Sequence, residues 1–473
     1  MERGSLLVAL VAAAAVWAPA EAGPLGLPVE APLEAGAVWL ELHSGRVRIT
    51  VSREAAPTLR ILDLAHGEDS DGFVLVEERE KWLEITQPHG DERTAPPLDV
   101  DLTVRPGTEV LLKGGGITVT VEGGAAAADK GAEAGDRGDH EDFTVELDRS
   151  RVLLRDVTSA GVEGRDSDVQ VEGGAGRLRL AQVGGSTTVE DRRGRIEIAG
   201  EDPAYRLVRF EGYVEGRMEG GSLTVEDSVA TLQLAGNDAQ FLLDGWRGTG
   251  SIRGRYDEVE LVRSGGDGER LTLDGEDFDV RAEEFDGELT AVLRSGNFVA
   301  QGLRGRVSLR LSEGAAAEIR GAKGGLRADL SGGARLVAEE VEPAIELDAK
   351  NSRVDLASVR SVRATLHRSE LSADEIEGRV QITATASDLD LDLTESRTTS
   401  EIQLRGTSRA TVDLRQPCVV NPEGGREARN RVDVSGCAIG GSRRPAGRRA
   451  SGAPSVLRLS VGPGAQASVY GMP

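Results

Sequence analysis

The sequence predicts an all-β chain that folds as a β-solenoid, and three observations lead to this fold class. Apolar and polar residues alternate from Val38 to the C-terminus, which is the period of a half-buried strand. No segment of comparable length follows the 3.6-residue period of an amphipathic helix. The predicted strands begin about nine residues apart, which is typical of a chain built from repeated coils.

Composition indicates a core of aliphatic side chains. Only 3% of the 473 residues are aromatic, whereas 61 are glycine and 29% are charged. The formal net charge is −24, from 80 acidic and 56 basic side chains, and it argues against a nucleic-acid binder, because affinity for phosphate needs a positive surface. High charge with low hydrophobicity also occurs in disordered chains. The strand period favours a folded chain instead.

Residues 1–22 are predicted to be a secretory signal peptide. Arg3 supplies a basic start, an apolar run of 13 residues extends from Leu6 to Ala18, and residues 20–22 (Ala-Glu-Ala) offer a cleavage site. The run is shorter than the roughly 20 residues of a membrane-spanning helix, so a retained anchor is the weaker interpretation. We therefore expect an exported protein of the periplasm, the cell surface or the extracellular space, with no transmembrane segment.

Residues 23–97 are expected to form an N-terminal β segment, a possible cap for the strand edges that a solenoid end exposes. The repeat region is expected over residues 98–415. Residues 122–142, rich in glycine, alanine and charge, are predicted to be a mobile loop within it.

Two short motifs open the predicted strands. Gly-Arg before an apolar-x-apolar strand begins at Gly45, Gly176, Gly194, Gly305 and Gly378. Serine opens similar strands at Ser167, Ser352 and Ser387. Further strands start at Val169, Leu178, Thr187 and Ile196, and like motifs recur after two such steps. The repeat is therefore about eighteen residues long and contains two strand-plus-turn halves.

Each half leaves about four residues for a turn. Glycine supplies the positive φ that a tight turn needs, and serine or aspartate closes a turn through hydrogen bonds to the local backbone. Stacked coils would then bury the apolar faces of their neighbours. A long antiparallel meander with four-residue turns has the same spacing and stays open as the alternative.

The middle of the chain holds most of the aromatic residues. Nine of the fifteen lie between Tyr205 and Phe298. We interpret them as packing in a wider section of the solenoid, because rings in β-rich chains are more often buried than exposed. A ligand platform is the alternative. The residues in question include Phe241, Trp246, Tyr256 and Phe278.

Residues 416–473 are expected to form a C-terminal region that contains a disulfide and a flexible basic linker. Cys418 and Cys437 are the only cysteines, and export would place them in an oxidising compartment where pairing is expected. A zinc site is disfavoured because two cysteines without a nearby histidine supply too few ligands. Residues 440–454 resemble a solvated linker with four arginines.

Motifs for catalysis, cofactors or metals are missing from the sequence. The five histidines are scattered, and neither a nucleophile elbow nor a phosphate-binding loop appears. Asp388, Asp390 and Asp392 alternate with leucines on one predicted strand, so they face the same side. Such a row suggests a calcium site or the active site of a carbohydrate-active β-helix, but a solvated polar face is the default interpretation. We assign no catalytic, cofactor-binding or metal-binding residue.

Basic residues are almost all arginine, and they alternate with acids. Arg177 and Arg195 lie one repeat apart, so they would stand about 4.8 Å from each other on adjacent strands. Neighbours such as Glu172, Glu190 and Glu197 are expected to interleave with them. We interpret this mosaic as mainly structural. Its guanidinium groups are also suited to bidentate contacts with sulfated or carboxylated sugars.

The segment 96–124, PPLDVDLTVRPGTEVLLKGGGITVTVEGG, resembles the bacterial "putative adhesin" family of exported β-strand repeat proteins. The matching features are a strand that ends in a Pro-Gly turn, glycine-led short strands and the nine-residue series. The resemblance covers roughly residues 35–415. This chain departs from the family's pattern by having arginine where aspartate or asparagine usually follows the turn glycine. The resemblance implies a β-solenoid-like fold outside the cytoplasm and brings no catalytic residue.

The sequence therefore predicts an exported, non-enzymatic binding or scaffold module of the bacterial envelope, with an adhesin-like role. Its expected partner is a surface glycan or protein of unknown identity, and the oligomeric state stays open. A carbohydrate-active β-helix enzyme and a purely structural envelope protein are the alternatives.

Overall fold

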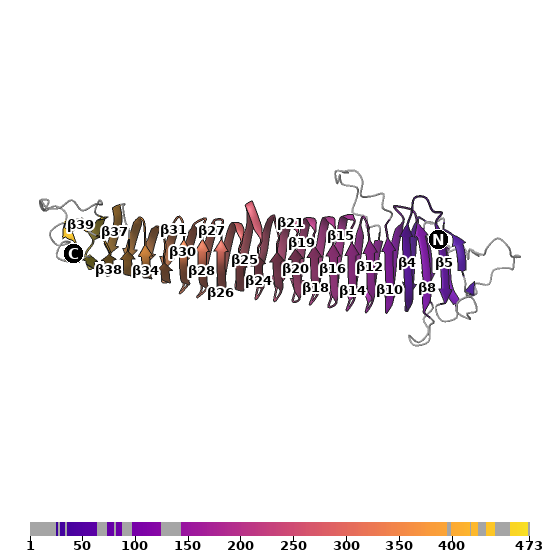
Figure 1. Cartoon of the computed structure of the whole chain (residues 1–473). Helices are drawn as coiled ribbons and strands as arrows, with labels where there is room; N and C mark the ends of the chain where they lie inside the picture. The colour runs from indigo at the N-terminus through magenta and orange to yellow at the C-terminus, as the bar shows by residue number, and fades with distance from the viewer. Residues whose placement is uncertain are drawn as a thin grey trace. The chain divides into compact units, whose positions relative to one another are not determined.

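The computed structural model describes residues 25–26, 29–33, 36–63, 73–79, 82–87, 97–123, 143–394, 399–416, 418–423, 432–439 and 455–471. The regular elements in these ranges are all strands, so the all-β prediction is confirmed (Figure 1). No helix in these ranges is long and apolar enough to cross a bilayer. The predicted signal peptide, most of the predicted loop (residues 124–142) and the basic linker (440–454) lie outside the described residues.

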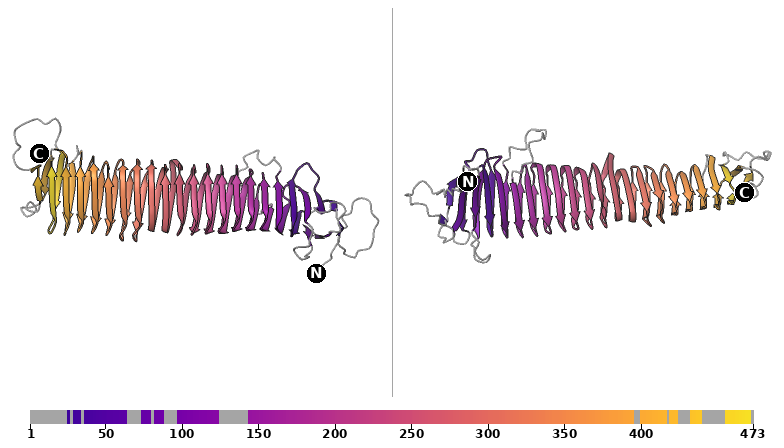
Figure 2. Two further views of the ribbon diagram at one scale, coloured as in Figure 1. Left: turned by 60° about the horizontal axis from the view of Figure 1, so that its bottom comes forward. Right: turned by 180° about the vertical axis from the view of Figure 1, so that it is seen from behind.

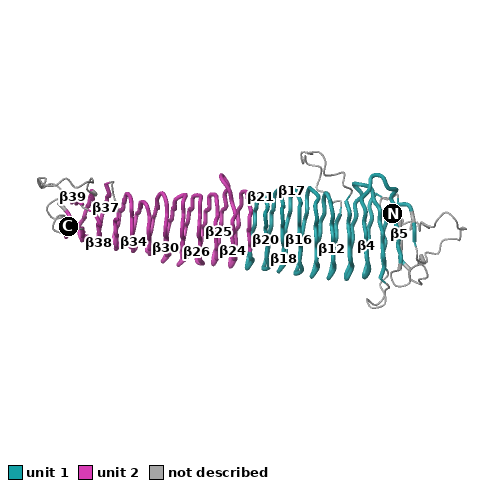
Figure 3. The backbone as a smooth tube through the Cα atoms, viewed as in Figure 1, with its two compact units in different colours: residues 1–240 teal, residues 241–473 magenta. Residues whose placement is uncertain are grey.

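Two compact units divide the chain, and each is described by itself. Unit 1 comprises residues 1–240 and unit 2 comprises residues 241–473 (Figure 3). Within each unit the strands stack in regular succession (Figure 2).

The strands of unit 1 form two series. The first seven are β1 (Leu25–Gly26), β2 (Val29–Pro32), β3 (Ala37–Leu42), β4 (Gly45–Val51), β5 (Thr58–Asp63), β6 (Phe73–Arg79) and β7 (Trp82–Thr86). The repeat follows with β8 (Leu98–Val104), β9 (Glu109–Gly115), β10 (Ile117–Glu122), β11 (Phe143–Asp148), β12 (Arg151–Arg155), β13 (Ala160–Arg165), β14 (Asp168–Glu172), β15 (Ala175–Val183), β16 (Ser186–Glu190), β17 (Arg193–Glu201), β18 (Ala204–Val208), β19 (Glu211–Glu219), β20 (Ser222–Glu226) and β21 (Val229–Asn237).

From β9 onward, strands of the repeat pair in parallel with the strand one coil further along, whereas β4 lies between β8 and β10 and is parallel to both. Val169 pairs with Thr187 in one sheet, and Leu178 pairs with Ile196 in the other. Each nine-residue step therefore crosses between the sheets, and eighteen residues return the chain to the same sheet. The predicted β-solenoid is confirmed, and the antiparallel meander is excluded for this repeat because its neighbouring strands would run in opposite directions.

The strands before residue 98 change this pairing. β5 is antiparallel to β8, and β2 is antiparallel to β5. In the other sheet β7 is parallel to β3, and the following pairs, β6 with β7 and β1 with β6, are antiparallel. The first strands of unit 1 thus continue both sheets outward with pairings that the repeat does not use.

The strands of unit 2 follow the same plan. They are β22 (Gln240–Asp244), which begins at the boundary, β23 (Thr249–Arg255), β24 (Glu258–Val262), β25 (Gly265–Glu283), β26 (Asp286–Leu303), β27 (Val307–Ser312), β28 (Ala316–Ala322), β29 (Leu326–Leu330), β30 (Arg335–Val341), β31 (Ile345–Lys350), β32 (Arg353–Ala357), β33 (Val362–His367), β34 (Glu370–Ile376), β35 (Val380–Thr385), β36 (Asp388–Leu393), β37 (Thr399–Arg405), β38 (Arg409–Leu414), β39 (Cys418–Glu423), β40 (Val432–Ser435), β41 (Ala438–Ile439), β42 (Ser455–Val461) and β43 (Gln466–Gly471). Parallel pairs again link strands about one coil apart, as Leu371 with Leu389.

Aliphatic ladders fill the interior between the two sheets. In unit 1, Val171, Val189 and Leu207 stand in register on successive strands of one sheet, and all are fully buried. Leu178 and Ile196 do the same on the facing sheet. Each added coil covers the apolar face of the previous one, so the core grows with chain length and needs few rings.

Corners between strands use residues in the left-handed region of φ. Glycine was expected there, but twenty described residues other than glycine have a positive φ, and seven of these are aspartates. Aspartate tolerates this region because its short carboxylate bonds to the local backbone. The corner residue is often followed by a buried serine.

These serines form a ladder in unit 2. The Oγ atoms of Ser352, Ser369 and Ser387 donate to the carbonyl oxygens two residues earlier, at 2.9–3.0 Å. Each Oγ of Ser369, Ser387 and Ser408 also accepts the backbone N–H of the serine one coil before it, at 3.1–3.3 Å. The local turn bond was predicted from the sequence, and the link between coils was not.

Candidate functional site

The aromatic residues named from the sequence divide into two groups. Phe241, Trp246 and Phe278 are at most 2% exposed, so the packing interpretation is confirmed for them. It is wrong for Tyr256, which is 56% exposed and has a φ of +59° at a corner. One exposed ring does not make a platform, because sequence-tolerant stacking surfaces use several rings side by side.

The three aspartates of β36 do not converge. Asp388 and Asp390 are exposed, and Asp392 is half-buried beside Arg415, with which it forms an ion pair. Alternate residues of a strand lie roughly 6.6 Å apart, so the first and third carboxylates are separated by about 13 Å. That spacing is too long for one calcium ion, whose oxygen ligands lie about 2.3–2.6 Å from it. No group of three or more metal-ligating side chains occurs among the residues that the structure describes.

Arginine and glutamate interleave on the surface of unit 1. Arg177 and Arg195 are direct neighbours on β15 and β17, as predicted. Glu197 lies between them: one oxygen is 2.9 Å from Arg177 and the other is 2.9 Å from Arg195. The other two expected acids pair elsewhere, Glu172 with Arg155 and Glu190 with Arg209. These ion pairs mostly join one coil to the next.

Unit 2 repeats this arrangement with other residues. Arg255 pairs with Glu276 at 2.7 Å, Arg270 with Glu288 at 2.9 Å, and Arg320 with Glu339 at 2.9 Å, each across one coil. Exposed ion pairs contribute little stability individually, on the order of 0.2–1 kcal/mol. Their regular spacing instead gives the outer faces alternating donors and acceptors.

A groove of about 930 Å³ crosses one sheet of unit 1. It is built from β11, β13, β15, β17 and β19, which lie side by side in parallel register. Five strands span roughly 19 Å, so the groove is elongated across the strands. Its lining residues are Glu146, Leu147, Asp148, Glu163, Gly164, Arg165, Ala181, Gln182, Val183, Ala199, Gly200, Glu201, Arg217 and Glu219.

Two alanines at one outward register position make the floor of the groove, and two glycines lie in the adjacent row, in which Gln182 and Met218 are buried. Ala181 and Ala199 stand in the outward row where the flanking coils carry Glu163 and Arg217. In the next row, Gly164 and Gly200 leave room for neighbours. A Cβ at Gly164 would lie 3.2 Å from the side chain of Gln182, and one at Gly200 would lie 2.7 Å from Pro203. The floor is therefore low and largely apolar.

Charged side chains surround this floor. The lining contains five carboxylates and two guanidiniums. Glu146 is paired with Lys113 at 2.6 Å and Asp148 with Arg149 at 3.0 Å, so part of the acidic charge is neutralised. Val183 is 41% exposed at the centre of the outermost row, with Arg165 and Glu201 on either side of it. The groove thus offers apolar contact flanked by hydrogen-bond donors and acceptors.

A smaller depression lies in unit 2. It has a volume of about 460 Å³ and is lined by residues that include Arg353, Arg368, Glu370 and Asp388. Asp388 is therefore near two arginines and apart from the other two aspartates of β36. The depression is therefore a charged part of the surface at a turn between strands.

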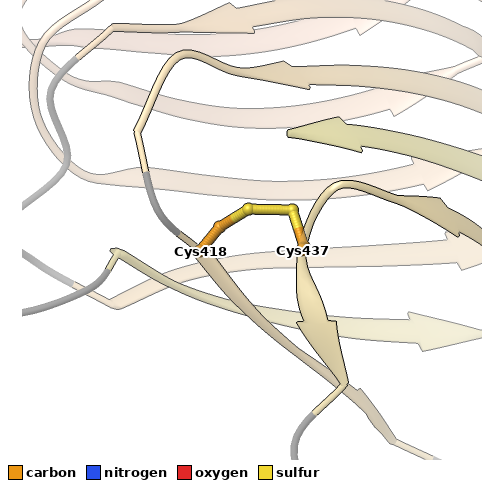
Figure 4. Close-up of a disulfide and its surroundings, with 2 residues drawn as sticks. All are labelled: Cys418 and Cys437. Atoms are coloured by element: carbon orange, nitrogen blue, oxygen red, sulfur yellow. A yellow bond between two sulfur atoms is a disulfide. The ribbon is translucent and has the colours of Figure 1, made fainter. Parts of the chain in front are cut away.

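The two cysteines form the predicted disulfide. Cys418 begins β39 and Cys437 follows β40, and their Cα atoms lie 5.0 Å apart (Figure 4). Cys418 is 5% exposed, so the bond is partly shielded by the end of unit 2.

Comparisons with protein families, with curated proteins and with solved structures find no match for this chain. The groove was not anticipated from the sequence. Its signal was present as small residues eighteen apart, at Ala181 and Ala199 and two coils apart at Gly164 and Gly200. It could be interpreted only once the register of the strands was known.

Proposed function

We propose that this chain is an exported, non-enzymatic β-solenoid that serves as a binding and scaffold module of the cell surface or periplasm, with an adhesive role. We further propose that the groove over β11 to β19 binds an extended glycan chain. The observation that carries this proposal is the groove itself, which crosses five coils and has an apolar floor at Ala181 and Ala199 between charged side chains.

The chemistry of the groove suits a hydroxyl-rich polymer. Carboxylates such as Glu201 accept hydrogen bonds from hydroxyl groups, while Arg165 donates to hydroxyl or carboxylate oxygens. The apolar floor at Ala181 and Ala199 suits the C–H faces of sugar rings. The side chains of Arg165 and Glu201 are both exposed, so a ligand in the groove can reach them.

Export and adhesion are supported by sequence features. The first 22 residues have the pattern of a signal peptide, and the resemblance to the adhesin family extends over most of the repeat. The disulfide is consistent with an oxidising compartment. The predicted fold class and the observed one agree, and they supply a long repetitive surface on which such a role depends.

A binding screen tests the proposal. The purified full-length chain is applied to immobilised envelope polysaccharides, matrix proteins and whole cells, and retention is measured. We expect retention by at least one polysaccharide. Ala181→Trp with Ala199→Trp fills the groove and should weaken that binding at least tenfold. Ala235→Trp is the matched control, because Ala235 is exposed in the same outward row but lies outside the groove.

Three results would contradict the proposal. Retention on none of these materials would remove the binding role. Equal loss of binding in the control variant would remove the groove as its location. Shortening of the bound polysaccharide, measured with and without calcium, would contradict a non-enzymatic role and favour the carbohydrate-active alternative. Alanine substitutions at Asp388, Asp390 and Asp392 would then test whether these aspartates carry the activity.

A further inference from the structure

The last strands of the chain do not form the last coil of unit 2. β42 pairs in parallel with β37 on one side and with β39 on the other. β43 likewise lies between β38 and β40. After β38 the chain therefore leaves one coil position open, builds the next coil from β39 and β40, and returns to fill the gap with residues 455–471.

The outermost coil depends on this inserted segment. Among the described strands, β39 pairs only with β41 and β42, and β40 pairs only with β43. The inserted segment is part of the core: Leu459, Ala465 and Val469 are fully buried. Residues 418–439 are thus joined to the rest of unit 2 through strands that come later in the sequence.

The disulfide lies over the end of the inserted segment. A Cβ at Gly471, the last residue of β43, would be 2.5 Å from the sulfur of Cys437 and 2.6 Å from that of Cys418. Only glycine fits below the bond without displacing it. The disulfide therefore closes the outermost coil against the strand that the C-terminus inserts.

The connection to the inserted segment is longer than its path requires. Ile439 pairs with Val420, and Ser455 pairs with Cys418, so the connection must cross two strand spacings and shift by two residues. That distance is roughly 12 Å, which four extended residues span. The sequence supplies fifteen residues, 440–454, which reach about 50 Å when extended.

We propose that residues 455–471 are exchangeable, and that the slot between β37–β38 and β39–β40 also accepts the same segment of a second copy of this chain. The slot already matches this segment residue by residue, for example where Arg458 pairs in register with Glu401 and Asn421. A second copy presents the identical segment, and the long connection allows it to reach. Reciprocal insertion yields a dimer that keeps every contact of the single chain.

Exchange between two tagged copies tests this proposal. Two full-length versions with different N-terminal tags are mixed, treated with dithiothreitol to open the disulfide, and reoxidised. We expect a species of twice the monomer mass by light scattering that co-purifies with both tags. The matched control lacks residues 443–450. Its seven remaining residues span at most about 25 Å, which is enough to return within one chain but leaves little reach beyond it.

We expect the shortened variant to stay monomeric with an unchanged circular dichroism spectrum. A monomeric full-length protein after this treatment would overturn the proposal. Equal dimer formation by the shortened variant would also overturn it, because the contact would then lie elsewhere. Neither result bears on the groove of unit 1, so the glycan proposal stands or falls separately.

Discussion

The guanidinium of Arg192 donates a hydrogen bond to the backbone carbonyl oxygen of Val157, 35 residues earlier in the chain, at 2.8 Å. Arg192 is fully buried at a corner of unit 1. It also donates to three other carbonyls, those of Gly173, Thr158 and Ala175, at 3.2–3.4 Å. Gly174 makes room for it, because a Cβ there would lie 2.8 Å from the guanidinium.

Arg192→Met should destabilise unit 1. Burial lowers the pKa of Arg192 to about 10, so the side chain is still cationic at neutral pH and its desolvation opposes folding. Four carbonyls, one in a buried hydrogen bond and three in partly buried ones, would lose this donor in the variant. We expect the free energy of unfolding to fall by about 2–4 kcal/mol. Urea unfolding at pH 7, followed by circular dichroism, measures the change. Arg193→Met is the control, because that neighbour is exposed.

An increase in stability of Arg192→Met would contradict this prediction. It would mean that the cost of burying the charge exceeds the benefit of the four hydrogen bonds, as occurs for some buried ions that apolar residues replace. The free energy of unfolding of Arg192→Lys should lie between those of the wild type and Arg192→Met, because a single ammonium cannot reach carbonyls on two coils at once.

Ser369→Ala should break the serine ladder of unit 2. The Ser369 hydroxyl donates to the carbonyl of His367 and accepts the N–H of Ser352, and its side chain is buried. Alanine leaves that buried N–H without an acceptor, which costs about 1–3 kcal/mol. Thermal unfolding measures the effect. Ser372→Ala, on the outward side of β34, the strand that follows Ser369, should change stability by less than about 0.5 kcal/mol. Equal losses in both variants would refute the ladder's contribution.

Gly378→Ala should destabilise unit 2 through a steric clash. Gly378 belongs to a Gly-Arg motif, and a Cβ at this position would overlap the carbonyl oxygen of Arg360 on the adjacent coil. Because backbone must move, we expect a loss of about 1–3 kcal/mol. Gly115→Ala is the matched control in unit 1, since its Cβ would meet only Asp148, at ordinary contact distance. Unfolding in urea should show no loss for the control. Full stability of Gly378→Ala would show that the coils can separate at this point.

The period of the sequence was enough to predict the fold, because every coil has to bury its apolar face against the next coil. Val169 and Thr187 had to lie on the same face once strands and turns each took a fixed length. The Gly-Arg motifs could also be recognised in the sequence, but the structural reason for the glycine could not. Gly378 is needed for the close approach of a neighbouring coil, which appears only when Arg360 is placed beside it.

The candidate site could not be predicted in the same way. The pattern of Asp388, Asp390 and Asp392 suggests a site because carboxylates serve as metal ligands and catalytic groups, but an extended strand keeps the three side chains apart. The groove arises from small residues in register, at Ala181 and Ala199. Small side chains at this spacing are not a sequence motif that indicates a binding site. The position of the C-terminal strands could not be predicted either. Residues 455–471 alternate like any other strand, and nothing in that pattern indicates that they insert between two coils formed by residues earlier in the sequence.

Arg206→Gln should reduce the acid sensitivity of unit 1. Arg206 makes two hydrogen bonds to the Glu226 carboxylate, at 2.6 and 2.9 Å, and these hold the pKa of Glu226 below its ordinary value of 4.5. A carboxyl whose pKa is lowered in the folded state adds stability above that ordinary value, and the contribution is lost as the pH falls through the lowered one. At pH 6 we expect the variant to be less stable by up to about 1 kcal/mol.

The melting temperature measured from pH 6 down to pH 3 checks this expectation. The wild-type curve should fall more steeply than that of Arg206→Gln, so that the two approach each other toward the acid end as Glu226 takes up a proton. Arg217→Gln is the control, because Arg217 is 4.0 Å from Glu219 and both side chains are largely exposed. Its curve should follow the wild type throughout. Parallel curves for wild type and Arg206→Gln would show that the pair does not link folding to the protonation of Glu226.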